Sequence, residues 1–188
     1  GVIGSDHADA LTGNGGANTL IGGDGADTVN GGGGSDSILG GNGADSLNTG
    51  SGADTVFGGD DSDTIIANSD SGGDALYGDA GADSILAGGG ADTIDGGEGN
   101  DTINSGGGND RVSSGGGADL IFAGSGAETI DGGEGNDTIF ANASNDRLLG
   151  GNGADSLDAG IGTDTVFGGD DNDTIIATGD TIGDALYG

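Results

Sequence analysis

The chain has 188 residues, of which 50 are glycine, and it contains no proline, cysteine, methionine or tryptophan. Acidic residues number 33 against two arginines, and the resulting formal charge of −31 excludes nucleic acid as a partner, because phosphate binding requires a basic surface. No apolar run approaches the roughly 18 residues of a membrane helix, so we expect no membrane insertion.

A nine-residue period organises the chain from Gly4 onward. Twenty frames follow one another, and two of them, residues 67–77 and 177–187, are 11 residues long. Position 6 of the frame is aspartate in 18 of the 20 frames, with Asn18 and Glu128 as the exceptions, and position 8 is leucine, isoleucine or valine in all of them. Composition alone would favour a disordered chain. The unbroken aliphatic column argues for an ordered one.

A longer repeat is superimposed on the short one. Residues 40–78 match residues 150–188 at 30 of 39 positions, at an offset of 110 residues. This offset equals twelve short frames and the two extra residues of one long frame. We therefore expect residues 1–188 to form one continuous domain that is a segment of a longer tandem array.

Each frame predicts a turn followed by a short strand. The first turns are residues 4–9, 13–18 and 22–27, and three residues of strand follow each of them, a pattern that then recurs to the last frame. Side chains alternate along a strand, so position 8 faces inward and positions 7 and 9 face outward. The prediction is an all-β, right-handed parallel β-roll, or β-solenoid, with two nine-residue repeats per coil and about ten coils. The 11-residue frames should appear as loop bulges.

The repeats resemble the RTX, or haemolysin-type, calcium-binding nonapeptide GGxGxDxUx, in which U is a large aliphatic residue. The matching segments include GGDGADTVN from Gly22, GGNGADSLN from Gly40, GGEGNDTIN from Gly96, GGEGNDTIF from Gly132 and GGNGADSLD from Gly150. The resemblance covers almost the whole chain. It implies a parallel β-roll with Ca²⁺ bound between successive turns, and a secreted protein that crosses a type I channel unfolded and folds on exit.

Calcium is also the cation that suits the residue chemistry. The single aliphatic column is a small core for so many residues, and stacked aspartates repel one another, so a cation would relieve both problems. Ca²⁺ takes six or more oxygen ligands from carboxylates and carbonyls, and glycine lets a turn reach the conformations that bring carbonyls together. Mg²⁺ fits less well because it prefers tight octahedra and retains its waters. Zn²⁺ would need histidine or cysteine, and His7 is the only such residue.

The aspartates at position 6 are the predicted calcium ligands. Ten turns on each side of the roll allow about nine sites between turns, which sets an upper limit of about 18 ions. We expect weak or empty sites near Asn18 and Glu128, near Asp61 and Asp171, which replace the fourth glycine, and in the glycine-free turn 141–146. The predicted ligands are Asp9, Asp27, Asp36, Asp45, Asp54, Asp63, Asp74, Asp83, Asp92, Asp101, Asp110, Asp119, Asp137, Asp146, Asp155, Asp164, Asp173 and Asp184.

The outward positions carry apolar ladders. All aromatic residues fall at position 9, and they are Phe57, Tyr77, Phe122, Phe140, Phe167 and Tyr187. One outward column is predicted to read Ile21, Leu39, Phe57, Tyr77, Asp95, Ser113, Asp131, Leu149, Phe167 and Tyr187, and the other Thr12, Asn30, Asn48, Ile66, Leu86, Asn104, Phe122, Phe140, Asp158 and Ile176. Arg111 and Arg147 flank the polar interval of the first column and can fix the register of a partner. Two interpretations remain open, namely stacking that stabilises the sheet and a lateral contact surface for self-association.

Position 7 is serine or threonine in 14 of 20 frames, which predicts outward hydroxyl ladders. Regular threonine arrays can bind ice or carry sugars. Threonine is also favoured on exposed strands in general, and this is the interpretation we prefer.

No enzyme is predicted, because one histidine and the lack of cysteine, lysine, HExxH and GxSxG leave no nucleophile and base pair. We favour a calcium-stabilised extracellular structural protein, a bacterial surface fibre, sheath or S-layer-like component that self-associates. Calcium levels support a secreted or cell-surface location, since extracellular modules bind Ca²⁺ at about 10⁻⁴–10⁻³ M. The alternatives are an RTX segment of a secreted adhesin or ice-binding protein, and the C-terminal calcium-binding tail of a type I-secreted enzyme or toxin.

Overall fold

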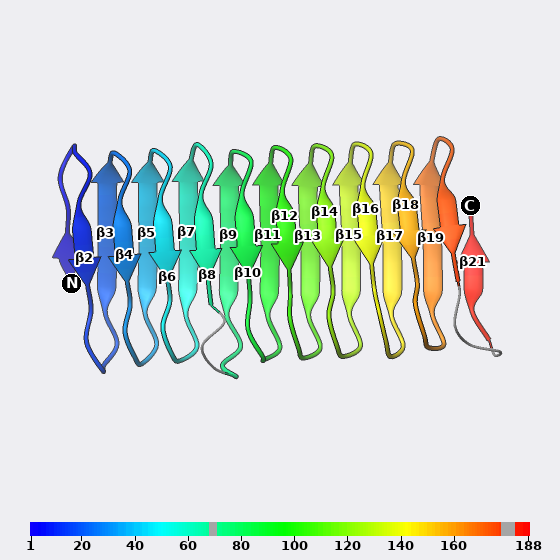
Figure 1. Ribbon diagram of the computed structural model, residues 1–188, viewed down its shortest axis with the longest axis horizontal. Coiled ribbons are helices and arrows are strands. Elements are labelled where there is room, and N and C mark those ends of the chain that lie inside the picture. The colour runs from blue at the N-terminus through cyan, green and yellow to red at the C-terminus, as the bar shows by residue number, and fades with distance from the viewer. Residues whose placement is uncertain (68–70, 178–182) are drawn as a thin grey trace.

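The computed structural model describes residues 1–67, 71–177 and 183–188, and all the regular elements in these ranges are β-strands. Successive turns stack along one long axis, so the described chain forms a straight, elongated roll (Figure 1). The same ranges contain no helix that is long and apolar enough to cross a membrane. The predicted all-β parallel solenoid of about ten coils is confirmed.

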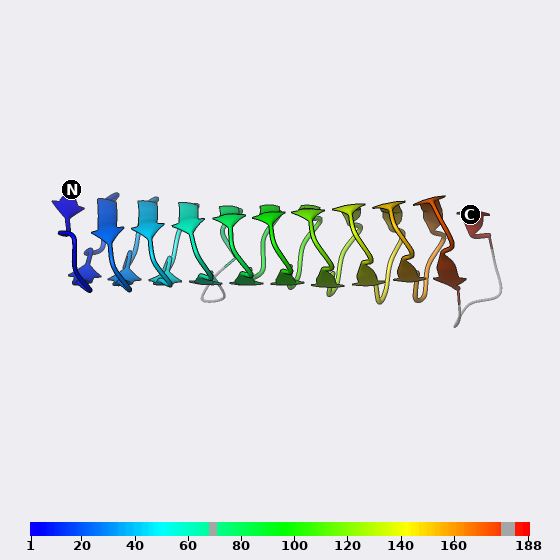
Figure 2. The ribbon, with the colours of Figure 1, turned by 90° about the horizontal axis from the view of Figure 1, so that it is seen from above.

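Two parallel sheets face each other across the core, as the view along the strand direction shows (Figure 2). The odd-numbered strands form an 11-stranded sheet, called here the long-strand sheet, and the even-numbered strands form a 10-stranded sheet, the short-strand sheet. The long-strand sheet comprises β1 (Val2–Ile3), β3 (Thr19–Asp24), β5 (Ser37–Asn42), β7 (Thr55–Asp60), β9 (Ala75–Ala80), β11 (Thr93–Glu98), β13 (Arg111–Gly116), β15 (Thr129–Glu134), β17 (Arg147–Asn152), β19 (Thr165–Asp170) and β21 (Ala185–Tyr187). The short-strand sheet comprises β2 (Ala10–Thr12), β4 (Thr28–Asn30), β6 (Ser46–Asn48), β8 (Thr64–Ile66), β10 (Ser84–Leu86), β12 (Thr102–Asn104), β14 (Leu120–Phe122), β16 (Thr138–Phe140), β18 (Ser156–Asp158) and β20 (Thr174–Ile176).

Equivalent frame positions stack directly on one another. Leu20 pairs with Ile38 one coil later, and Ile38 pairs with Val56. The register survives the first 11-residue frame, because Phe57 pairs with Tyr77 twenty residues on. Both predicted outward columns therefore exist as continuous ladders. The predicted loop bulges fall on residues 68–70 and 178–182, outside the described residues.

The two sheets differ in strand length, which the sequence pattern did not predict. Strands of three residues occur in the short-strand sheet, whereas β3 to β19 of the long-strand sheet have six. In the long strands pairing continues into the next turn, where Gly41 pairs with Gly23 and Gly59. Glycine makes this extension possible, because φ at Gly41 is 121°, in a region that other residues rarely adopt.

The core consists of the aliphatic column at position 8. These side chains are buried from Leu11 to Val166, while Ile175 is half-buried and Leu186 exposed, since β21 is paired on one side only. Alanines at position 1 of the turns that leave the short-strand sheet complete the core, and they are Ala67, Ala87, Ala123, Ala141 and Ala159. The sequence analysis did not assign these alanines an inward position.

Candidate metal centres

The position-6 aspartates form two buried columns, one in the turns at each edge of the roll. From Asp27 to Asp164 each is only 1–3% exposed, and Glu128, which occupies the same position, is 2% exposed. Asp9, Asp173 and Asp184, near the two ends of the described roll, are partly exposed. All the predicted ligands thus lie at equivalent places in the stacked turns.

One carboxylate oxygen of each stacked aspartate is held by the preceding coil. The backbone N–H of Asp119 donates to Oδ1 of Asp137 at 2.9 Å, and the N–H of Asp137 donates to Oδ1 of Asp155 at 2.8 Å. The pattern continues across the first long frame, where the N–H of Asp54 donates to Oδ1 of Asp74 at 2.8 Å. These hydrogen bonds fix the orientation of each carboxylate.

The second carboxylate oxygen points into the space between turns. Within the described part of the chain, Oδ2 is buried without a hydrogen-bond partner in Asp27, Asp36, Asp45, Asp63, Asp83, Asp101, Asp119, Asp137, Asp155 and Asp173. An unpaired buried carboxylate oxygen is energetically costly, and folded proteins avoid it unless another group completes the site. A row of such oxygens at a regular spacing is suited to binding a row of cations.

Backbone carbonyls converge on the same space. A Cβ added to Gly132 would lie 2.5 Å from the carbonyl oxygen of Gly150 and 2.6 Å from Oδ2 of Asp137. Two successive turns on the same edge thus direct one oxygen each toward this point. The carbonyl of Gly135 also faces the next coil, since a Cβ on Gly153 would collide with it. Glycine leaves this space open at turn 132–137, whereas at the equivalent position of the preceding coil the side chain of Ser114 donates to the carbonyl of Gly132.

The donor set suits calcium. Each gap offers carboxylate and carbonyl oxygens, the ligands that Ca²⁺ prefers, and no nitrogen or sulfur ligand. No three acidic or histidine side chains converge anywhere in residues 1–67, 71–177 and 183–188, so a cation between turns would combine carboxylates with several carbonyls. Bound there, Ca²⁺ would supply the positive charge that the Oδ2 atoms lack and would join successive coils.

Electrostatics also favour a cation at these positions. Burial, reinforced by the charges of neighbouring aspartates, raises the pKa of Asp63 and of Asp137 to about 7 and that of Asp101 to about 6. The same causes raise the pKa of Asp45, Asp83 and Asp155. Without a cation, these six carboxylates therefore resist ionisation more than exposed ones, and Asp63 and Asp137 do so near neutral pH.

Glu128 interrupts one aspartate column. Both of its carboxylate oxygens are buried without a hydrogen-bond partner, and the described residues show no bond from the N–H of Asp110 to them. Burial and the adjacent Asp146 raise the pKa of Glu128 to about 8. The longer side chain does not reproduce the aspartate geometry, in line with the weak site expected there.

The other irregular turns keep the positive φ angles that glycine adopts in the regular turns. Asp61 and Asp171 have φ of 75° and 80°, and Asn142 and Ser144 in the glycine-free turn have φ of 72° and 100°. At Asn18 the side-chain Oδ1 accepts a hydrogen bond from the N–H of Asn14 at 2.7 Å and carries no charge. The turn shape is thus retained at these places with a different set of charges.

The outer surfaces of the two edges differ. Turns that leave the long-strand sheet place a charged or polar residue at position 3 in most coils, and from Asp24 to Asp170 the row reads Asp24, Asn42, Asp60, Ala80, Glu98, Gly116, Glu134, Asn152 and Asp170. We call this the acidic edge. Acids alternate with neutral residues along it, and Asn42 donates to Asp24 at 2.8 Å. Turns that leave the short-strand sheet form the neutral edge, whose described position-3 bridges join Gly33, Ser51, Gly89, Gly107, Ser125, Ala143 and Ile161.

The outward aromatic residues stack in pairs. Ring centroids are 4.7 Å apart for Phe57 and Tyr77, and 4.8 Å apart for Phe167 and Tyr187. The third pair, Phe122 and Phe140, lies on the short-strand sheet at 5.4 Å. The stacking interpretation is confirmed, and lateral contact stays a prediction.

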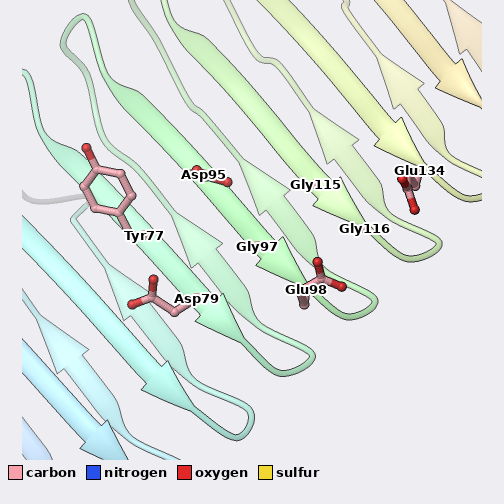
Figure 3. Close-up of a pocket in the computed structure, with 8 residues that line it drawn as sticks. All are labelled: Tyr77, Asp79, Asp95, Gly97, Glu98, Gly115, Gly116 and Glu134. Atoms are coloured by element: carbon pink, nitrogen blue, oxygen red, sulfur yellow. The ribbon is translucent and has the colours of Figure 1, made fainter.

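An acidic hollow of about 400 Å³ lies beside the first aromatic pair on the long-strand sheet (Figure 3). Tyr77, Asp79, Asp95 and Glu98 line one part of it and Glu134 another, around glycines that leave the surface low (Figure 3). All its carboxylates belong to strands of one sheet, which brings them to one face.

Comparison with known proteins agrees with the geometry. The family model of the RTX calcium-binding nonapeptide repeat (four copies) matches residues 3–38, 39–71, 68–103, 87–121, 104–139, 122–157 and 140–175. No curated protein matches the chain. The repeat is calcium-binding, its β-roll is a structural fold, and repeats of this kind typically occur in secreted bacterial proteins. The chain therefore belongs to the RTX calcium-binding nonapeptide-repeat family.

Proposed function

We propose that this chain is a calcium-stabilised structural segment of a bacterial extracellular assembly, a surface fibre, sheath or S-layer-like layer, without enzymatic activity. The observation that carries the proposal is the row of buried Oδ2 atoms facing carbonyls between turns. Metal binding that completes such sites is folding free energy, since the sites do not exist in the unfolded chain.

The position-6 aspartates are the proposed ligands, two from successive coils at each gap together with turn carbonyls. Sites between well-formed turns such as 132–137 and 150–155 bind most tightly. Those next to Asn18 and Glu128 bind weakly, because one lacks charge and the other places its carboxylate differently. About 18 ions remain the upper limit for the chain.

Self-association is the second part of the proposal. Apolar side chains lie outward in ladders that polar residues interrupt, with Leu39 40%, Phe57 36% and Phe122 37% exposed. Contiguous exposed apolar surface on a soluble protein is typical of an interaction site. The location follows from calcium, because sites of moderate affinity fill outside the cell and remain empty at cytosolic levels.

The test is electron microscopy of the calcium-loaded protein, combined with circular dichroism and limited proteolysis in a chelator. We expect ordered assemblies of rolls in calcium, and loss of both β-structure and protease resistance when calcium is removed. Restoring calcium should restore both signals, whereas the same concentration of Mg²⁺ should not. A chelated protein that keeps its spectrum and its resistance would contradict the proposal.

An adhesin or ice-binding segment is the second candidate, and the short-strand sheet favours it. Its outward hydroxyls stack in register from Thr28 through Ser46 and Thr64 to Ser84 and Thr102. Thermal hysteresis or glycan retention by the calcium-loaded monomer would support this candidate over the structural one.

A further inference from the structure

The two arginines are unpaired in a strongly acidic protein. Arg111 on β13 and Arg147 on β17 are exposed, and neither forms an ion pair with a carboxylate among the described residues. The guanidinium of Arg147 instead lies 4.8 Å above the ring of Phe167. Guanidinium groups are strong carboxylate ligands, so two unpaired ones on a single face indicate an anionic partner.

Both arginines occupy position 7 of the long-strand sheet, on either side of Thr129. A depression of about 190 Å³ lies between them, bordered by Ser113, Asp131 and Leu149 among others. The acidic hollow lies on the same face and extends from β9 to β15, so it borders this depression at β13 and β15. One face therefore carries an arginine site and an acidic site side by side.

The aromatic residues of this face are arranged symmetrically about its middle, whereas Asp95 and Leu149 occupy equivalent places on the two sides. Consider a two-fold axis that lies in the interface, parallel to the strands and midway between β13 and β15. It would bring β13 opposite β15 of a second copy, β11 opposite β17, β9 opposite β19, and β7 opposite β21. The sheet is straight in both views, so opposed faces can stay in contact along their length (Figures 1 and 2).

This arrangement gives each arginine a carboxylate. Arg147 would face Thr93 of β11 in the second copy, two residues before Asp95. Arg111 would face Thr129 of β15, two residues before Asp131. The offset of two strand residues, about 7 Å, is within reach of an arginine side chain.

The same axis matches the aromatic pairs. Tyr77 on β9 would face Phe167 on β19, and Phe57 on β7 would face Tyr187 on β21. Each stacked pair of one copy would thus cover the other stacked pair of its partner. Apolar contacts at the two ends and ion pairs in the middle would come from one symmetry operation, as in an isologous interface.

We propose that two copies of this chain bind face to face through the long-strand sheets, about a two-fold axis between β13 and β15, with Arg111 and Arg147 paired to Asp131 and Asp95. This deepens the proposed function by naming the partner and the contact. Charge complementarity commits the face to a second copy, because each half of the face carries one arginine and one position-9 aspartate, and the axis brings the arginines of one copy within reach of the aspartates of the other.

The available area is adequate. The strands from β7 to β21 at about 4.8 Å spacing, and six residues at about 3.3 Å rise, give a face of roughly 38 by 20 Å. Each partner in a standard protein interface buries about 800 Å², which is similar. We therefore expect a specific dimer of moderate affinity.

Calcium controls this contact through net charge. Two copies of formal charge −31 repel each other, and half that number of divalent ions, about 15 or 16, would neutralise each copy. This is close to the number of gaps between turns. Association should therefore require calcium for charge neutralisation as well as for folding.

Crosslinking tests the geometry. The axis places position 75 of one copy opposite position 165 of the other, and Ala75→Cys and Thr165→Cys leave every aromatic and charged residue in place. A bismaleimide of about 10 Å reach, the spacing of packed sheets, should join a mixture of the two calcium-loaded single variants into a heterodimer. Neither variant alone should crosslink, because its two thiols would lie about 24 Å apart.

Charge reversal tests the ion pairs. Arg111→Glu with Arg147→Glu should weaken the dimer at least tenfold in sedimentation at low salt, and so should Asp95→Arg with Asp131→Arg. Mixing the two variants should restore a heterodimer. Thr28→Glu, Thr64→Glu, Thr102→Glu and Thr174→Glu on the short-strand sheet change the net charge by the same amount as the arginine variant and should have a much smaller effect. Circular dichroism in calcium verifies the fold of each variant.

The outcomes separate this inference from the proposed function. Assemblies that form equally well with the arginines reversed would overturn the inference and leave the structural function standing. A folded, calcium-loaded protein that stays monomeric at every concentration would overturn both. Retention of that monomer on alginate through the arginines would assign the site to a carboxylated glycan, and the dimer would be wrong.

Discussion

The acidic and neutral edges of the roll hold the same inner aspartate column with different surrounding residues. At position 1 the acidic edge has glycine in every described turn except at Ser114, whereas the neutral edge has alanine, serine or threonine from Thr49 onward. At position 3 the acidic edge alternates acids with neutral residues, and the neutral edge has no described charge.

The comparison teaches which parts of the turn the fold constrains. Apart from Asn18 and Glu128 on the neutral edge, the inner carboxylate and the hydrogen bond to its Oδ1 are the same on both edges, because every coil must align with the next. The outer residues are free to differ, since they face solvent. Alternation at position 3 keeps like charges two coils apart, about 10 Å, which limits repulsion along the ladder.

The largest effect should come from changing the protonation of the inner columns in the absence of calcium. The pKa of Asp63 and Asp137 is raised to about 7 in the folded chain, against about 3.9 in an unfolded one. The folded state therefore binds more protons, so the stability of the calcium-free roll is greatest below about pH 4 and is lost as pH rises to about 7.

The opposite pH dependence should hold in saturating calcium, because ligands must be deprotonated to bind the ion. Thermal melts between pH 4 and pH 8, with and without chelator, would show the two opposite trends. Parallel trends in the two series would contradict the assignment of these carboxylates as ligands. The acidic edge should dominate, since Asp61 in its own turn adds to the raised pKa of Asp63, and Asp131 on the preceding strand adds to that of Asp137.

The second largest effect should come from exchanging carboxylate length between the edges. Asp119→Glu on the acidic edge should lose the hydrogen bond from Asp101 and weaken the adjacent ion sites, at a cost of about 3 kcal/mol if calcium is near 100 times its Kd. Glu128→Asp on the neutral edge should do the reverse and raise the melting temperature by a few degrees.

Calorimetry and calcium titration of these two variants provide matched measurements. The number of bound ions should fall for Asp119→Glu and rise for Glu128→Asp. Equal stability of the two variants and the parent protein would show that carboxylate length is irrelevant at position 6.

A smaller effect should follow from filling the space at Gly132. Gly132→Ala would push a methyl group against the Gly150 carbonyl and Oδ2 of Asp137, and should destabilise the calcium-loaded roll by about 1–3 kcal/mol. Gly132→Ser should cost less, because its hydroxyl can donate to the Gly150 carbonyl as Ser114 does to Gly132 at 2.6 Å.

On the neutral edge, Ala141→Gly is the matched control. It should cost about 1 kcal/mol through backbone entropy and the loss of one buried methyl group, without loss of bound calcium. Chemical denaturation in calcium measures all three variants. A Gly132→Ala protein with unchanged stability and ion content would place the cation elsewhere in the turn.

The smallest effect should come from the outer charges. Glu98→Gln with Glu134→Gln should weaken calcium binding about twofold at low salt, because charges some 10 Å from an ion interact weakly in water. Ser51→Glu with Ser125→Glu on the neutral edge should strengthen it by a similar factor. Both changes should vanish near 1 M salt, and titration at two ionic strengths would reveal a salt-independent effect if one exists.

Much of the fold could be predicted because its determinants are local. Alternation along a strand places Leu47 inward and Asn48 outward wherever the frame occurs. Two nine-residue frames place Asp45 one coil after Asp27, at the equivalent position. The same alternation and spacing also predicted the two outward columns at position 9. The strand-length difference and the inward alanines did not, because they depend on how each turn packs against its neighbours.

The candidate sites were predictable as a set of aspartates and not as a geometry. The period identified Asp137, and only the stacked structure showed that Oδ1 accepts the N–H of Asp119 while Oδ2 is left facing carbonyls. The acidic edge could have been found by comparing position 3 in alternate frames. The sequence analysis counted the aspartates at position 6 and did not make this comparison.

The amino-acid order alone determined which side chains face inward, which face outward and which recur in each coil, because these depend on the period of the strand and on nearest neighbours. Tertiary structure decided which oxygen of each carboxylate lacks a partner and how far each strand of the long-strand sheet extends into the following turn. These properties arise from residues 18 or 20 positions apart meeting in register, and a short repeat does not contain that information.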